Sequence, residues 1–455
     1  MRARTGSKPH RRPAADDDKP GLAARKTAAR LLSAVIDTRT SLDALTDNEH
    51  GHPQYLALEP RDRALVRAIL VSALRHRNTI ASLIESRLER PLPANAHALS
   101  HVLHVGAAQI LFLDVPDSAA VDLAVAQAKD DPRTRRFSAL VNGVLRNLAR
   151  RKERSLPAAL AATRDAPKWF DARLQAAYGT ERAGAILAAH RLEAPVDFTV
   201  KSDAGKWAGL LGGRVLPGGS VRLDRLPDAV TALPGFEEGA WWVQDAAAAL
   251  PARLLGNIEN LDVADLCAAP GGKTAQLAQA GARVTAVDQS ANRLKRLAGN
   301  LERLGLTAEI VQADLMQWQP PRLFDAILLD APCSSTGTVR RHPDVPWTKT
   351  PEDIARLAEL QRRLAEQAAG WVKPGGTLVF SNCSLDPAEG EQLVAALLAA
   401  RQDLVLSPIA PEEIPGAERF VTAEGHLRTT PETGGEDAMS LHDVDGFFAA
   451  RLKRL

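Results

Sequence analysis

From about residue 260 onward, short apolar segments alternate with longer helical ones, and this alternation restricts the fold more than any other feature of the sequence. Helical periodicity fills the gaps between the apolar segments, for example in Gln289–Leu304 and Ile354–Trp371. Strand and helix in alternation predict an α/β domain with a parallel, doubly wound sheet. We place this domain at residues 256–455. The expected strands are Val263–Leu266, Arg283–Val287, Glu309–Val311, Ala326–Leu329 and Thr377–Phe380.

A glycine-rich turn follows the first expected strand, in the segment Asp265-Leu-Cys-Ala-Ala-Pro-Gly-Gly-Lys-Thr274. Such a turn lets the backbone approach a ligand closely and directs the N–H groups of the next helix toward it. A P-loop would need a glycine where Cys267 stands. The dinucleotide fingerprint also fails, because Gly271 and Gly272 are adjacent. The turn therefore lacks a phosphate-binding fingerprint, which favours a nucleoside ligand without phosphates, such as S-adenosylmethionine.

Acidic residues stand at the ends of the next three strands, where ligands of a doubly wound sheet bind. Asp288 is suited to ribose hydroxyls, Asp314 to an adenine edge, and Asp330 ends the fourth strand. Any one of these aspartates could merely cap a helix. Their succession along neighbouring strand ends favours a common binding site.

Two cysteines also follow strands: Cys333 in Asp330-Ala-Pro-Cys-Ser-Ser335, and Cys383 in Ser381-Asn-Cys-Ser384. A single cysteine is most often a small buried apolar residue. A thiolate and a carboxylic acid are, however, the groups that methylation of cytosine at carbon 5 requires. Addition of a thiolate to carbon 6 makes carbon 5 nucleophilic, and an acid such as Asp330 can hold the Watson–Crick edge.

The front of the chain is helical in pattern and basic. Residues 1–150 contain 23 Lys and Arg against 16 Asp and Glu, whereas the whole chain has a net charge of only +2. A basic helical region fits a polyanion-binding domain, and a solvated Arg-rich surface explains the charge equally well. We expect a disordered tail at 1–20, a helical domain at 21–155 and a small α+β subdomain at 156–255.

Several segments together resemble the Nol/Nop/Sun family of RNA (cytosine-5)-methyltransferases, and its RsmB type in particular. They are DLCAAPGGKT, DAPCSSTGT with RRHPD, SNCSLDPAEGE, the closing DGFFAARL, and WVQDAA before the α/β domain. RDRALVRAIL, VDLAVAQAK and RRFSALVNGVLRNLAR resemble a NusB-type RNA-binding domain. The resemblance covers nearly the whole chain after residue 20. It implies an all-α NusB-like domain, a small α+β subdomain and a Rossmann-like class I methyltransferase domain.

The resemblance also implies roles for individual residues. Cys383 would be the nucleophile, and Cys333 would assist product release, although DNA cytosine methyltransferases use the Pro-Cys cysteine as nucleophile. Asn382 departs from the family, which commonly has threonine there. The implied S-adenosylmethionine site consists of Cys267, Ala268, Ala269, Pro270, Gly271, Gly272, Lys273, Asp288, Asp314 and Asp330.

Ribosomal RNA as the substrate rests on the resemblance alone, and transfer RNA stays open. Two other functions are a non-catalytic RNA-binding or antitermination factor, which leaves Asp330, Cys333 and Cys383 unexplained, and a methyltransferase for small molecules or proteins. With three cysteines, none in CxxC spacing, we expect neither disulfides nor a metal site. No apolar run reaches the roughly 18 residues that span a bilayer. A cytoplasmic monomer is expected.

Overall fold

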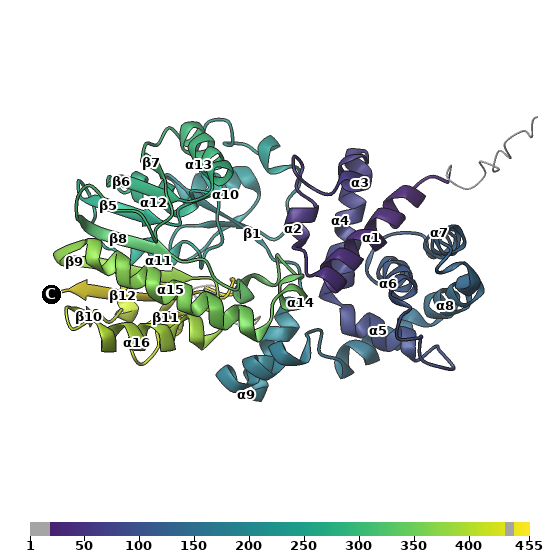
Figure 1. The fold of residues 1–455 in the computed structure, drawn as a ribbon. Helices are drawn as coiled ribbons and strands as arrows, with labels where there is room; N and C mark the ends of the chain where they lie inside the picture. The colour runs from purple at the N-terminus through teal and green to yellow at the C-terminus, as the bar shows by residue number, and fades with distance from the viewer. Residues whose placement is uncertain (1–18, 433–440) are drawn as a thin grey trace, which may run out of the picture. The chain divides into compact units, whose positions relative to one another are not determined.

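The computed structural model describes residues 19–432 and 441–455. The described residues fall into two compact units that divide after Asp165 (Figure 1). All but the last two residues of the predicted tail, 1–20, lie outside the described residues. Among the helices that are described, none combines the length and apolar character needed to cross a bilayer.

The first unit is all-helical, as predicted. Its central helix, α6, is buried on nearly all sides and packs against α1, α4, α5, α7 and α8. Gly106 permits the close approach to α8, because a Cβ there would lie 2.6 Å from Leu145 Cδ1. The helices are α1 Leu22–Thr38, α2 Leu42–Leu45, α3 Pro53–Leu56, α4 Pro60–Arg75, α5 Arg77–Glu85, α6 His97–Phe112, α7 Asp117–Asp130, η1 Arg135–Phe137 and α8 Ser138–Ala162.

The second unit begins with helix α9 (Lys168–His190) and a small antiparallel sheet of order β2-β3-β1-β4. Phe198, Val221 and Trp241 form the core of this sheet with residues of α10. The sequence did not predict β3, which has only three residues and an arginine at its centre. The elements are β1 Val196–Val200, α10 Ala204–Leu211, β2 Arg214–Val215, β3 Val221–Leu223, η2 Val230–Ala232 and β4 Trp241–Val243.

The large sheet has the order β10-β12-β9-β8-β5-β6-β7, with β11 paired to β12. The strands from β9 to β7 are parallel, as predicted. At the other edge β10, β11 and β12 pair antiparallel, an arrangement that the alternating pattern did not indicate. The strands are β5 Asp262–Leu266, β6 Arg283–Asp288, β7 Glu309–Gln312, β8 Phe324–Asp330, β9 Val372–Asn382, β10 Leu404–Leu406, β11 Leu427–Arg428 and β12 Phe448–Arg454.

Apolar side chains cover both faces of the large sheet. Leu328 and Leu329 are fully buried neighbours on β8, and they belong to the cores on opposite faces. Burial on both faces explains why these strands read as continuous apolar runs. The helices and 3₁₀ turns are α11 Leu250–Arg253, α12 Gly272–Gln279, α13 Ala291–Leu304, η3 Thr336–Thr338, α14 Val345–Thr348, α15 Pro351–Trp371, η4 Pro387–Glu389, α16 Glu391–Ala400, η5 Pro411–Glu413 and η6 Glu418–Phe420.

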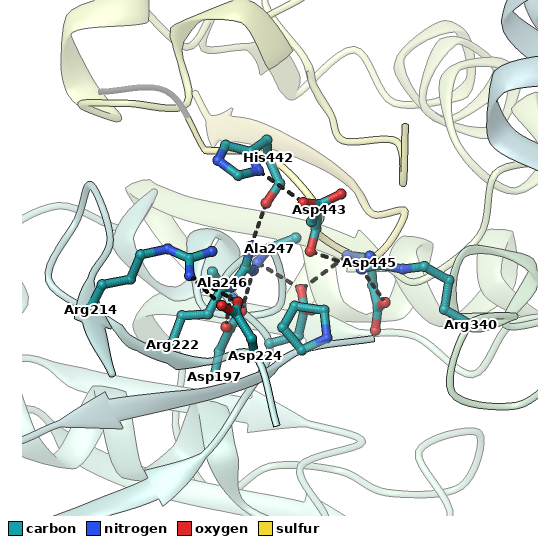
Figure 2. A network of polar contacts seen from close by, with 12 residues as sticks. Asp197, Arg214, Arg222, Asp224, Ala246, Ala247, Arg340, His442, Asp443 and Asp445 are labelled. Carbon is teal, nitrogen blue, oxygen red and sulfur yellow. Dashed lines mark hydrogen bonds and ion pairs between the residues drawn. The ribbon is translucent and has the colours of Figure 1, made fainter. Parts of the chain in front are cut away.

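A buried ion pair joins the small sheet to the segment that precedes β12 (Figure 2). Arg222 of β3 donates two hydrogen bonds to Asp197 of β1, at 2.6 and 2.7 Å, and neither side chain is exposed. Asp197 also accepts from the backbone N–H of Ala246, and Arg222 donates to the carbonyl of His442 at 2.6 Å. Each charge is therefore both paired and hydrogen-bonded, as buried ions require.

Replacing Asp197 by alanine would leave the Arg222 guanidinium buried without its counter-ion. We expect Asp197→Ala to lower the free energy of unfolding by about 3–5 kcal/mol, measured by urea denaturation with tryptophan fluorescence. Asp224→Ala is the matched control, since it breaks the exposed pair with Arg214 and should cost at most about 1 kcal/mol. Equal losses in the two variants would contradict a stabilising role for the buried pair.

Candidate active site

The predicted site residues lie along the carboxyl ends of the parallel strands. Asp288 is the last residue of β6, and Asp330 is the last residue of β8. Asp314 lies two residues beyond β7, and Cys383 directly follows β9. Since β6, β5, β8 and β9 are neighbours, these strand ends face a common edge of the sheet.

The loop Cys267–Gly271 connects β5 to α12 and requires glycine near its end. Gly271 has φ of 104°, and a Cβ there would lie 2.9 Å from Leu297 Cγ. Lys273, in the first turn of α12, donates a hydrogen bond to Asp330 Oδ2 at 2.8 Å. Ser381 of β9 donates to the other oxygen, Oδ1, at 2.9 Å. The Asp330 carboxylate is thus held from two sides while its side chain stays about 30% exposed.

One cavity lies beside the ends of β6 and β7. Its volume is about 90 Å³, and its lining combines Cys267, Asp288 and Asp314 with apolar side chains such as Leu315 and Pro332. Asp288 accepts hydrogen bonds from the N–H groups of the loop residue Ala269 and of Ser290. Carboxylates in the lining of an otherwise apolar slot suit a ligand with hydroxyl groups and a flat ring.

A second cavity of about 340 Å³ lies against the other residues of the loop. Lys273, Asp330, Trp242 and Asp265 are among its lining residues. Asp265 accepts from Thr274 Oγ1 through Oδ2, and its Oδ1 is buried without a hydrogen-bond partner. Burial raises the pKa of the Asp265 carboxyl to about 7, with the carboxylates of Asp330 and Asp288 adding to the rise.

The predicted cofactor residues therefore divide between two cavities. Cys267, Asp288 and Asp314 line the smaller one. The others line the larger one: Ala268, Ala269, Pro270, Gly271, Gly272, Lys273 and Asp330. Sequence spacing could not show this division, which depends on the path of the loop between β5 and α12.

The two cysteines that follow β8 and β9 meet at the same edge. Their sulfur atoms are 3.4 Å apart, within hydrogen-bond range for sulfur. The pairing of β8 with β9 sets Asp330 opposite Ser381, so that Cys333 and Cys383 leave their strands side by side. The backbone N–H of Gly337 donates to the carbonyl of Cys383 at 2.9 Å and ties the two loops together.

The surroundings divide the three thiols by acidity. The hydrogen bond with Cys333 lowers the pKa of Cys383, and the Ser335 hydroxyl adds to this effect. The same sulfur–sulfur hydrogen bond, together with burial, raises the pKa of Cys333. Burial and nearby carboxylates also raise the pKa of Cys267. Cys383 is thus the thiol that most readily becomes a thiolate, the reactive form of a cysteine.

Two residues hold the cysteine loops: Asn382, which the sequence marked as a departure from the family, and Glu389, which it did not single out. Asn382, the departure from the family pattern, donates to Gln361 Oε1 at 2.9 Å and to the carbonyl of Glu389 at 2.6 Å, and accepts from the N–H of Ser384. Glu389 is fully buried beneath both loops. It belongs to the motif SNCSLDPAEGE, and its place among polar residues was the only signal in the sequence.

Comparisons with known proteins give consistent matches. A family model for the 16S rRNA methyltransferase RsmB/F matches residues 252–453, and a NusB family model matches residues 22–150. Ribosomal RNA small subunit methyltransferase B of Klebsiella pneumoniae is 35% identical over 447 residues, which cover 94% of this chain and 97% of that protein. The protein of the same name from Salmonella typhi is also 35% identical, with 94% and 98% covered.

Solved structures share the fold. A methyltransferase homologue from Pyrococcus horikoshii has a TM-score of 0.53 and 30% identity, over 64% of this chain and 95% of that one. NSun6 from Pyrococcus horikoshii with SFG has a TM-score of 0.54 and 21% identity, over 63% and 98%. PH0851 has a TM-score of 0.69 and 22% identity, over 97% and 100%.

The raised pKa of Asp265 predicts a pH-dependent stability. With a pKa near 7 in the folded chain and about 3.9 unfolded, the native state holds an extra proton between these values, so stability falls as pH rises through the interval. Asn at this position cannot ionise and still accepts from Thr274. Relative to the native protein, Asp265→Asn should gain up to about 4 kcal/mol between pH 4 and pH 8.

Urea denaturation of both proteins across this pH range measures the difference. A gap between the two stability curves that stays constant with pH would show that the buried carboxyl does not titrate there.

Proposed function

Because the chain belongs to the RsmB/F family of 16S rRNA methyltransferases, we propose that it methylates carbon 5 of a cytosine in small-subunit ribosomal RNA, with S-adenosylmethionine as methyl donor and Cys383 as nucleophile. Asp330 and Cys333 complete the catalytic set. The domain limits predicted at residues 20, 155 and 255 are part of this proposal.

The proposal rests chiefly on the pair of cysteine sulfurs, 3.4 Å apart. A structural cysteine needs no second thiol and no acid beside it. A nucleophilic cysteine, in contrast, needs a group that stabilises its thiolate, and here the Cys333 thiol supplies a hydrogen bond to Cys383. Asp330 and Lys273 lie at the adjoining strand end, where they line the larger cavity.

The residues around the loop fit S-adenosylmethionine. Asp288 and Asp314 line a slot with apolar walls, which suits ribose hydroxyls and adenine. In the larger cavity, the buried Asp265 Oδ1 lacks a hydrogen-bond partner and can accept one from an ammonium group. When bound, the cofactor supplies an electrophilic methyl group.

Cys383 starts the reaction as a thiolate. Its sulfur bonds to carbon 6 of the cytosine, the C5–C6 double bond breaks, and the displaced electron pair makes carbon 5 nucleophilic. Asp330 accepts a hydrogen bond from the 4-amino group, and the ammonium of Lys273 stabilises charge that develops on the ring. The target base must leave any stack to enter the cavity.

Once carbon 5 carries the methyl group, release of the product breaks the bond between the Cys383 sulfur and carbon 6. A base removes the proton from carbon 5, the C5–C6 double bond forms again, and the sulfur of Cys383 leaves carbon 6 with its electron pair. The S–H group of Cys333 donates a hydrogen bond to this departing thiolate. The higher pKa of Cys333 suits this role, because a donor must keep its proton.

RNA is the proposed partner of the helical unit. NusB-type domains resemble residues 22–150, and this part of the chain carries the basic excess. Ribosomal RNA is favoured over transfer RNA by the names of the relatives. A non-catalytic RNA-binding factor would have no use for the cysteine pair and its acid.

The two cysteines should fail in different ways. Cys383→Ala removes the attacking sulfur, so both methyl transfer and covalent RNA adducts should be lost. Cys333→Ala removes a hydrogen bond to the Cys383 thiolate, so attack should slow but persist. It also removes the donor to the departing sulfur, so a protein–RNA adduct should accumulate. Denaturing electrophoresis with labelled RNA and cofactor measures both effects.

The control is the double variant, in which both Cys333 and Cys383 are alanine. If the adduct of Cys333→Ala forms through Cys383, the double variant should form no adduct. An adduct in Cys383→Ala but not in Cys333→Ala would exchange the roles of the two residues. Full activity in both single variants would rule out the covalent mechanism.

We expect the protein to bind S-adenosylmethionine in the absence of RNA, and Asp288 to contribute to this binding. Removal of its carboxylate strands ribose hydroxyls, and Asp288→Ala should weaken S-adenosylmethionine binding by about 1–3 kcal/mol in calorimetry. Asp325→Ala removes a carboxylate near the opposite, amino end of β8, where it pairs with Lys373, and should bind normally. Equal affinities of the two variants would place the ribose elsewhere.

A further inference from the structure

The buried carboxylate of Glu389 receives hydrogen bonds from both cysteine loops. Its Oε1 accepts from the N–H of Ser334 at 2.9 Å and from Gln361 Nε2 at 2.8 Å. Its Oε2 accepts from the hydroxyl of Ser384 at 2.5 Å and from the hydroxyl of Ser334. Ser334 directly follows Cys333, and Ser384 directly follows Cys383. One carboxylate therefore bridges the residues next to each sulfur.

The hydrogen bonds around Glu389 fit its ionised form. The backbone N–H of Asp386 donates to Ser384 Oγ, which leaves the hydroxyl hydrogen of Ser384 for the carboxylate. The N–H groups of Ser334 and Gln361 can only donate. All of these donors are neutral, so the negative charge of Glu389 is hydrogen-bonded without an ion pair among these four contacts.

The cations near Glu389 form ion pairs with other carboxylates. On the side of α9, Arg173 pairs with Asp386, and on the side of β11, Arg428 pairs with Glu391. Beside Cys383, the ammonium of Lys273 pairs with Asp330. Glu389 therefore acts on the cysteine pair as a carboxylate whose charge these cations neutralise only at a distance.

We propose, on the basis of the function inferred above, that Glu389 is a positioning residue that holds the two cysteine loops in register and keeps the proton of the cysteine pair on Cys333. The geometry supports the first part, because Glu389 contacts the residue next to each sulfur. The contacts also support the second, because Oε1 accepts from the N–H of the peptide that follows Cys333, whereas the carboxylate reaches the Cys383 loop through the Ser384 hydroxyl. A negative charge disfavours a thiolate near it. Burial raises the pKa of Glu389, so the effect operates at pH values above that pKa.

The acidities of the two thiols agree with this assignment. The Glu389 carboxylate is among the groups that raise the pKa of Cys333, after the hydrogen bond with Cys383 and burial. The largest influences on the pKa of Cys383 are Cys333, burial, Ser335, Asp330 and Lys273. The charge of Glu389 thus adds to the difference in pKa between two thiols that share one hydrogen bond.

Alkylation of the cysteines at different pH values tests the proposal without RNA. Iodoacetamide reacts with thiolates, and both Cys333 and Cys383 are partly exposed. In the unmodified protein, mass spectrometry should show Cys383 alkylated at lower pH than Cys333. In Glu389→Gln, which keeps the size of the side chain but not its charge, the midpoint for Cys333 should fall by about one pH unit, a roughly tenfold faster reaction below the midpoint.

Two controls separate charge from structure. Ser384→Ala removes one hydrogen bond to the carboxylate and keeps its charge, so the midpoint of Cys333 should not fall. Glu359→Gln makes the same substitution on the exposed surface of α15 and should leave both midpoints and methyl transfer unchanged. Thermal unfolding of each variant shows whether it is folded. With RNA and cofactor, Glu389→Gln should accumulate covalent adduct increasingly as pH rises.

Alkylation of Cys333 before Cys383 in the unmodified protein would overturn the proposal, and this test does not depend on whether any variant folds. An unchanged Cys333 midpoint in folded Glu389→Gln would do the same. If the unmodified protein methylates no cytosine while the alkylation results hold, the proposed function fails and the assignment of the proton stands.

Discussion

The parallel pairing of β8 with β9 is the constraint on which the candidate active site depends. It sets Asp330 opposite Ser381, and the chain leaves both strands at the same edge of the sheet. Cys333 comes three residues after Asp330, and Cys383 comes two residues after Ser381, so their sulfurs meet at 3.4 Å. A register shift of one residue would turn each of these side chains to the other face and separate the acid from the thiols.

Around this edge of the sheet, the neighbouring charges and burial affect the protonation of each carboxyl and thiol group differently. Lys273 neutralises Asp330, whereas Asp265 lies in a buried position that favours its protonated form. Among the thiols, Cys383 and Cys333 share a hydrogen bond, and only the pKa of Cys383 is lowered. The candidate site therefore combines one thiol of lowered pKa with neighbouring thiol, carboxyl and ammonium groups.

The sequence predicted the parts of the fold in which local pattern and tertiary environment agree. Strands β5, β6 and β8 are buried on both faces, so their apolar runs were recognisable, and the residues after them had to lie at one edge. Strand β3 was missed because Arg222 interrupts three residues whose burial depends on the distant Asp197. The antiparallel edge formed by β12 was missed because a single strand pattern does not reveal its direction.

For the candidate site, the family resemblance indicated which residues to expect, and the structure showed how they are arranged. Glu389 looked like one acid among several in a polar motif, and its contacts with Ser334 and Ser384 depend on residues about 55 and 5 positions away. The division of the loop residues between two cavities was likewise inaccessible, since spacing along the chain does not say on which side of a loop a side chain lies.

The central claim, that Cys383 attacks the base, can be tested directly in the unmodified protein with RNA containing 5-fluorocytidine. Fluorine at carbon 5 leaves no proton to remove after methyl transfer, so the attacking sulfur stays bonded to carbon 6. After digestion, mass spectrometry identifies the peptide that carries the nucleotide. The account predicts that this peptide contains Cys383. A nucleotide on Cys333, or no bonded nucleotide in the presence of S-adenosylmethionine, would contradict it.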